Sequence, residues 1–224
     1  MKKYILALLL STVPFVAVSS DWKYELREIV SKTKKADGST TYFFNMDVFD
    51  YYIGRIATHA KEYPPRFRSK EERAEVTEKL KKLIRGVSNL SENQQDNPEF
   101  LLRSAFIQSM AHNLNIKGAA IKAKRDFERV LLIAPNDIKA NYLFGMFLSG
   151  TSKYHYDGIP YLEKALNGGK ARAQFTLGLL YYQQGHKEKG MSYLRQYSQS
   201  KPHQELVKNV ISAIDSGNVE FNNY

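Results

Sequence analysis

Residues 171–202 read ARAQFTLGLLYYQQGHKEKGMSYLRQYSQSKP, and this stretch decides the fold of the chain. Its apolar residues recur three or four positions apart on both sides of Gly185, which predicts two short helices joined by a turn. Gly178 and Gly190 place one small residue in each helix, and Pro202 ends the second one. We expect the two glycines to let the helices approach closely, because glycine has no β-carbon.

The same pattern returns at an interval of about 34 residues towards the N-terminus. In the first helix of each unit a large residue precedes a small one, as Met110-Ala111, Phe144-Gly145 and Leu177-Gly178. In the second helix the small residues are Ala123, Gly158 and Gly190, and the bulky residues four positions later are Phe127, Leu162 and Leu194. Several positions that repeat together indicate three stacked helical hairpins between Pro98 and Pro202.

On these residues, positions 98–202 resemble tetratricopeptide repeats, which are helix–turn–helix units of about 34 residues. Ala173, Tyr181 and Gly185, together with Leu177-Gly178, are also similar to the related Sel1-like repeat. The resemblance implies an all-α fold, a right-handed α-solenoid of about four helical hairpins closed by a C-terminal capping helix. It also implies a protein that binds extended peptides or partner helices.

Outside residues 98–202 the chain divides into four further segments. They are a targeting segment (1–20), an N-terminal segment (21–46), a divergent helical hairpin (47–97), and a capping helix with a polar tail (203–224). Gly54 is the candidate small residue of the divergent hairpin. The helices expected outside 171–202 are 48–62, 70–90, 98–113, 119–133, 138–148, 158–166 and 205–215.

The first twenty residues have the form of a secretory signal peptide. They read MKKYILALLLSTVPFVAVSS, with two lysines, an apolar run, and small residues at Ala17, Ser19 and Ser20. The apolar run is shorter than the ~20 residues that a membrane-spanning helix needs, and Pro14 interrupts it. We therefore expect export from a bacterial cell with cleavage after Ser19 or Ser20, either into the periplasm or out of the cell.

Residues 21–46 differ in character from the helical part. Asp37-Gly38 is a turn signal between two runs rich in apolar and aromatic residues. This pattern predicts either a β-hairpin or an irregular, extended segment that leads into the first helix. Trp22, the only tryptophan of the chain, is expected to pack against the first helices.

The chain is basic, with 33 Lys and Arg residues against 23 Asp and Glu residues and a net charge of +10. Removal of residues 1–20 takes away two lysines and leaves +8. This charge favours anionic partners, such as acidic proteins, anionic lipid head groups or cell-wall polymers. The cations are spread rather than gathered in one block, and we expect no nucleic-acid partner. The lack of cysteine excludes disulfides and thiolate sites.

No motif in the chain predicts catalysis. There is no metal-ligand helix motif, phosphate-binding glycine loop, dinucleotide fingerprint or nucleophile elbow. The histidines are scattered without a recurring spacing to carboxylates, at His59, His112, His155, His186 and His203. We therefore expect a protein that is not an enzyme, with no catalytic residue, no metal site and no cofactor.

The resemblance places the partner-binding surface on the first helix of each unit, along the concave face of the array. Counted from Gly145 and Gly178, the residues expected to face a partner are Lys139, Tyr142, Met146, Arg172, Phe175, Leu179 and Tyr182. Two cations beside aromatic and flexible apolar side chains suit a peptide that carries a carboxylate and an apolar anchor. Alternatively, the apolar residues Tyr142, Met146, Phe175 and Leu179 pack against the adjacent unit.

Two functions stay open on the sequence. The first is a non-catalytic scaffold of the bacterial cell envelope that binds a partner peptide or helix in the concave face. The second is a secreted basic factor that binds an anionic cell-wall polymer, a lipid surface or a host protein. Basic clusters at 66–70 and 117–129 either serve the second function or are ordinary solvated helix faces. The polar and aromatic loop 151–156 is either a contact loop or an ordinary surface loop.

Overall fold

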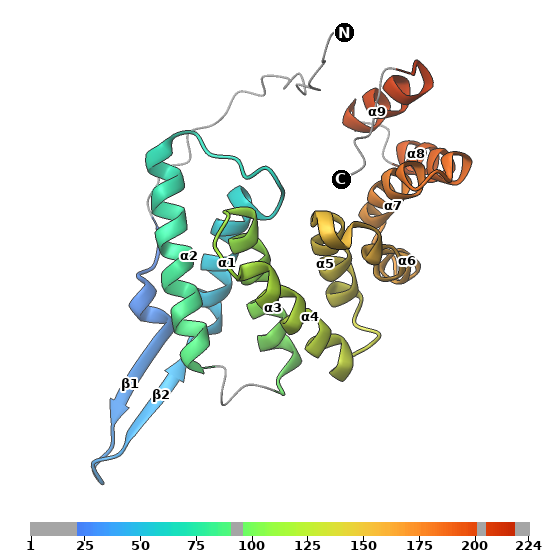
Figure 1. Ribbon diagram of the computed structural model, residues 1–224. Coiled ribbons are helices and arrows are strands. Elements are labelled where there is room, and N and C mark those ends of the chain that lie inside the picture. The colour runs from blue at the N-terminus through green and yellow to red at the C-terminus, as the bar shows by residue number, and fades with distance from the viewer. Residues whose placement is uncertain (1–21, 91–95, 201–204, 218–224) are drawn as a thin grey trace.

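The computed structural model describes residues 22–90, 96–200 and 205–217, and most of these residues are helical. Figure 1 shows the helices as an elongated array, with a β-hairpin near one end and α9 at the other. The predicted α-solenoid is therefore confirmed, and the N-terminal segment, expected to be either a β-hairpin or extended, forms a hairpin. No described helix combines the length and the apolar composition needed to cross a bilayer. The predicted signal peptide lies outside the described residues.

Three helical hairpins form the repeated part of the array. They pair α3 with α4, α5 with α6 and α7 with α8, and α9 packs on α8. The bounds are α3 Pro98–Asn113, α4 Ala119–Ile133, α5 Ile138–Ser149, α6 Ile159–Asn167, α7 Arg172–Gln183, α8 Lys187–Ser200 and α9 Glu205–Asp215. Where the sequence predicted separate bounds for these helices, they agree to within one residue. The loop between α5 and α6 forms a 3₁₀ helix, η3 Ser152–Gly158.

Two pairs of glycines bring the helices of a hairpin into backbone contact. A β-carbon on Gly158 would lie 2.6 Å from the carbonyl oxygen of Gly145, where α6 meets α5. A β-carbon on Gly190 would lie 2.6 Å from the carbonyl oxygen of Gly178, where α8 meets α7. No side chain fits at such a distance, so only glycine permits these crossings. The predicted role of the small residues is confirmed.

Bulky residues fill the space beside each contact point. Phe127, Leu162 and Leu194 stand at the same position of the second helix, and all three are fully buried. A β-carbon on Gly178 would lie 2.7 Å from Cγ of Leu194, which shows how closely the leucine covers the glycine. The repeated pair of a small and a bulky residue therefore sets how closely the two helices of a hairpin pack.

The N-terminal segment is a β-hairpin, one of the two alternatives that the sequence left open. It follows a 3₁₀ helix, η1 Leu26–Ile29, and its strands are β1 Val30–Lys34 and β2 Thr40–Phe44, paired antiparallel. The turn uses Gly38 at φ +84°, and the carboxylate of Asp37 accepts hydrogen bonds from the backbone and hydroxyl of Ser39. The hairpin projects from the helical body in Figure 1.

Aromatic packing joins the N-terminal segment to the first two helices. Trp22 lies between them: its ring stacks on Tyr52 of α1 Met46–Ala60 at 4.9 Å, and its Nε1 donates to Glu75 of α2 Lys70–Leu90. The expectation that Trp22 packs against the first helices is confirmed. Gly54 was wrongly assigned as the small residue of this unit, because a β-carbon there would meet no atom within 4 Å.

Asparagine and aspartate caps explain where several helices begin. The Asn97 side chain accepts hydrogen bonds from the backbone of Glu99 and Phe100, and Pro98 occupies the first helical turn. The Asp137 side chain caps α5 through the backbone N–H of Ala140. In the same way, the Asn45 side chain caps α1, which therefore begins two residues before its predicted start at 48.

Candidate functional site

The first helices of successive units lie side by side in chain order, with α1 against α3, α3 against α5 and α5 against α7. We call the surface that these four helices share the inner surface. Lys139 and Arg172 stand at the starts of α5 and α7, and both are exposed. The other five predicted contact residues are half-buried: Tyr142, Met146, Phe175, Leu179 and Tyr182.

Arg172 of α7 lies close enough to Tyr142 of α5 for its charge to act on the tyrosine hydroxyl. Burial raises the pKa of the Tyr142 hydroxyl, and the nearby Arg172 guanidinium acts in the opposite direction. Tyr197 of α8 and Glu62, which follows α1, also lie close enough to raise this pKa. Two of the predicted residues therefore lie within electrostatic range of each other, and so does Glu62 from the first unit.

Met146 and Phe175 serve partly as packing residues. The sulfur of Met146 accepts a hydrogen bond from the Thr176 hydroxyl at 3.4 Å, which ties α5 to α7. The Phe175 ring lies 6.0 Å from the ring of Tyr197, and Phe175 and Leu179 border the cluster around Leu194. Each side chain contributes to the contacts between units and still leaves part of its surface to solvent.

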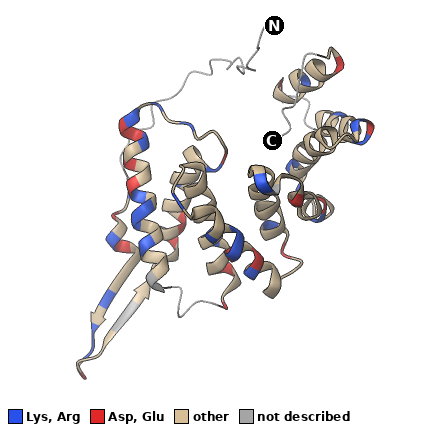
Figure 2. Cartoon of the chain, in the orientation of Figure 1, with Lys and Arg blue, Asp and Glu red and all other residues tan. Residues whose placement is uncertain are grey.

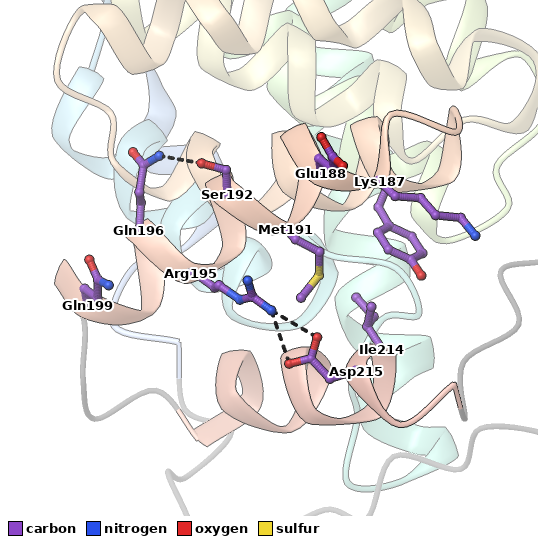
Figure 3. Close-up of a pocket in the computed structure, with 10 residues that line it drawn as sticks. Lys187, Glu188, Met191, Ser192, Arg195, Gln196, Gln199, Ile214 and Asp215 are labelled. Carbon is purple, nitrogen blue, oxygen red and sulfur yellow. Dashed lines mark hydrogen bonds and ion pairs between the residues drawn. The ribbon is translucent and has the colours of Figure 1, made fainter.

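Tyr182 lies apart from the Tyr142–Arg172 pair, at the other end of α7. It lines a cavity of about 670 Å³ between α8 and α9, where Lys187 lies 5.8 Å from the centre of its ring. Figure 3 shows this cavity, with Met191 and Ile214 inside it and the ion pair between Arg195 and Asp215 across it. The distance in that ion pair is 3.2 Å. No feature of the sequence predicted this cavity.

An ion pair on the inner surface was also missed. Arg103 of α3 donates from Nε to Asp50 of α1 at 2.7 Å, and its Nη2 donates to the second carboxylate oxygen at 2.9 Å. These hydrogen bonds lower the pKa of Asp50, and Lys139 of α5 lowers it further. Because Asp50 and Arg103 are 53 positions apart, local spacing holds no signal for the pair.

The repeat interval could have identified one more inner-surface position. One interval before Met146 is His112 on α3, whose ring lies 5.9 Å from the ring of Phe147 in an edge-on contact. Burial lowers the pKa of His112 and favours the neutral imidazole. Within residues 22–90, 96–200 and 205–217, no three His, Asp or Glu side chains are close enough to hold a metal ion.

Comparison with known proteins bears on the fold alone. Neither a protein-family model nor a curated protein matches this sequence. A solved structure described as "MamA RS-1 ArsTM double mutant" is similar, with a TM-score of 0.52 and 20% sequence identity. The match covers 78% of this chain and 85% of that chain. The likeness supports the helical solenoid seen in this structure.

Proposed function

We propose that the chain is a non-catalytic scaffold that binds an extended segment of a partner protein along its inner surface. The observation that carries this proposal is the placement of Lys139 and Arg172, which are exposed at the starts of two adjacent inner helices. Half-buried Tyr142 and Phe175 follow one turn later on the same helices. Cations and partly exposed aromatic rings are the side chains that most often anchor a bound peptide.

The chemistry of this surface favours an acidic partner segment with an apolar anchor. A carboxylate would meet Lys139 or Arg172 in a charge-assisted hydrogen bond. The Phe175 ring lies beside the ring of Tyr197, so an apolar side chain of the partner would pack against aromatic rings. The net charge of +8 that remains without residues 1–20 would add a long-range attraction for an acidic partner.

A charge-reversal experiment tests the proposal. The double variant Lys139→Glu with Arg172→Glu should lose a partner that the unchanged protein retains in crosslinked pull-downs from the cell envelope. The matched control is Lys82→Glu with Arg85→Glu, which makes the same charge change on the exposed side of α2. Circular dichroism should show equal helix content in all three proteins. If both double variants retain the same partners as the unchanged protein, the inner surface is not the binding site.

We also propose that the protein works outside the cytoplasm, most simply in the periplasm, after cleavage of residues 1–20. The support is the lysine-first, apolar and small-residue pattern of that segment. Cell fractionation should find the protein in the periplasm or the medium, with an N-terminus at Ser20 or Asp21. A cytoplasmic protein that keeps its first twenty residues would contradict this.

A second candidate function is binding to an anionic surface through α4. Ile121 and Leu132 are 77% and 82% exposed on α4, which also carries the exposed cations Lys122 and Arg125. Figure 2 shows the Lys and Arg residues of α4 beside acidic ones. Exposed apolar side chains among cations are typical of helices that lie on lipid head groups. This function predicts binding to anionic vesicles that weakens strongly with salt.

A further inference from the structure

The β-hairpin is an incomplete sheet. Of the residues that the structure describes, β1 and β2 pair only with each other. Each strand has five residues, and the hairpin stands away from the helices in Figure 1. A two-stranded ribbon of this size is marginally stable in water, and a third strand is the usual means of stabilising it.

The hydrogen-bond pattern shows which backbone groups are unused by the hairpin. Asn45 donates to the carbonyl of Ile29 and Lys35 donates to the carbonyl of Ser39, so these residues form hydrogen-bonded pairs. Such pairs alternate along an antiparallel ladder, and the next ones are Ser31 with Phe43 and Thr33 with Thr41. The N–H and C=O groups of the residues between them point away from the partner strand. On β2 these residues are Thr40, Tyr42 and Phe44.

The two outer edges differ in charge. On β1 the residues whose backbone points outward include Lys32 and Lys34, and lysines on an edge discourage another strand from pairing there. The sequence of β2, TTYFF, has no charged residue. Figure 2 shows the same difference, with Lys on β1 and no charge on the described part of β2. The outer edge of β2 is therefore the edge open to a third strand.

We propose that the outer edge of β2 binds an extended segment of a partner protein in which acidic and apolar residues alternate. The main-chain groups of Thr40, Tyr42 and Phe44 would pair with the backbone of that segment, as in β-strand addition. An acidic segment fits because the hairpin, residues 30–44, carries Lys32, Lys34 and Lys35 against one acid, Asp37. A second copy of this basic chain would bring like charges together.

Lys32 and Lys34 lie on one face of the hairpin, and the apolar side chains of the bound segment would lie on the other face. Phe43 is 55% exposed on that face and lines a cavity of about 570 Å³ at the base of the hairpin. Phe44, Met46 and the acids Glu28 and Asp47 also line this cavity. An apolar side chain next to Phe43 would be covered there, whereas a carboxylate would face two like charges. Alternation of acidic and apolar residues satisfies both faces.

The test uses the full chain and a synthetic peptide, acetyl-Thr-Val-Glu-Val-Glu-Val-Thr-amide, with a fluorescent label. Tyr42→Pro removes an outward N–H that the hairpin does not use, so the β1–β2 ladder should persist. Tyr42→Ala is the matched control because it removes the same side chain and keeps the N–H. We expect Tyr42→Pro to weaken peptide binding by about tenfold relative to Tyr42→Ala, as for the loss of one or two backbone hydrogen bonds.

Two further readouts locate the peptide on the chain. Amide hydrogen exchange should slow at Thr40, Tyr42 and Phe44 when the peptide is added, and the already bonded Phe43 should change little. The same peptide with Lys in place of Glu should bind more weakly, and Lys32→Glu should reverse that preference. Equal binding by Tyr42→Pro and Tyr42→Ala overturns the proposal. The proposal is also overturned if, without peptide, hydrogen exchange at the β2 edge slows as the protein concentration rises. That result would show that a second copy of the chain occupies the edge.

Discussion

The backbone contact between α7 and α8 offers a direct test of the packing argument, through the substitution Gly190→Ala. The added β-carbon would lie 2.6 Å from the carbonyl oxygen of Gly178 and 2.6 Å from the backbone nitrogen of Tyr182. Both atoms belong to the backbone of α7, so a change of side-chain rotamer cannot relieve the contact. The two helices must instead move apart at their crossing.

The expected cost follows from two opposing effects. Overpacking in a well-packed interior costs about 1–3 kcal/mol, and contact with backbone places this site at about 3 kcal/mol. Alanine is favoured over glycine in a helix by about 1 kcal/mol or less, which offsets part of that cost. We therefore expect Gly190→Ala to lower the free energy of unfolding by about 2 kcal/mol. For a protein of this size, the melting temperature should fall by about 4–8 °C.

Urea unfolding followed by circular dichroism measures this effect, with Gly86→Ala as the matched control. Gly86 lies in the exposed part of α2, and a β-carbon there would meet no atom within 4 Å. The control should therefore gain about 0.5–1 kcal/mol from helix propensity alone. Gly178→Ala should be milder than Gly190→Ala, because its nearest atoms belong to the Leu194 side chain. Equal stabilisation by Gly190→Ala and Gly86→Ala would refute the close-approach explanation.

Three further predictions concern the core and two titrating groups. Leu194→Ala should lower the free energy of unfolding by about 2–5 kcal/mol in the same urea assay, because Leu194 is fully buried. The control Leu132→Ala, at an 82% exposed position, should change this free energy by less than about 0.5 kcal/mol. Burial raises the pKa of Tyr52 to about 12. The stabilising contribution of the neutral Tyr52 hydroxyl should therefore be complete below pH 10 and be lost as the pH rises through 12. Tyr52→Phe should remove this alkaline dependence of stability, which tyrosinate absorbance and unfolding curves would measure. The Arg103 guanidinium lowers the pKa of Asp50, so this stabilisation should be present above the ordinary pKa of about 4 and be lost as the pH falls through the lowered value. A double-mutant cycle with Asp50→Asn and Arg103→Gln should give a coupling of about 0.2–1 kcal/mol at neutral pH, since the pair is partly exposed, and a coupling that persists unchanged in acid would contradict the assignment.

The repeated part of the fold was predictable because its signals are local. Helix bounds from 98 to 133 follow from the spacing of apolar residues and from Pro98, and the structure reproduces them. The pairing of Gly178 with Gly190 follows from the repeat interval, because small residues stand where the two helices cross at the same position of each unit. The seven predicted contact residues stay a prediction, and Tyr182 lies apart from the others at the α8–α9 cavity.

The first unit was less predictable because its packing is not that of the repeats. Gly54 stands at a plausible interval, yet a β-carbon there would meet no atom within 4 Å. Trp22 links α1 and α2 instead, because it stacks on Tyr52 and donates to Glu75. Whether residues 21–46 form a hairpin also depended on contacts that a sequence pattern does not contain. Phe44 lies 5.1 Å from Phe49 and 6.1 Å from Phe100, which fixes the base of β2 on α1 and α3.

The sequence by itself determined the class of fold, the repeat length and the helices that succeed one another, because hydrophobic period, caps and small residues act over a few positions of the chain. Only the tertiary structure decided what those helices present to a partner. It joined Asp50 to Arg103, set Tyr182 at the α8–α9 cavity and, among the described residues, placed no third strand on the β2 edge. These features arise between residues far apart in the chain, and their positions depend on the angles at which whole helices and strands pack.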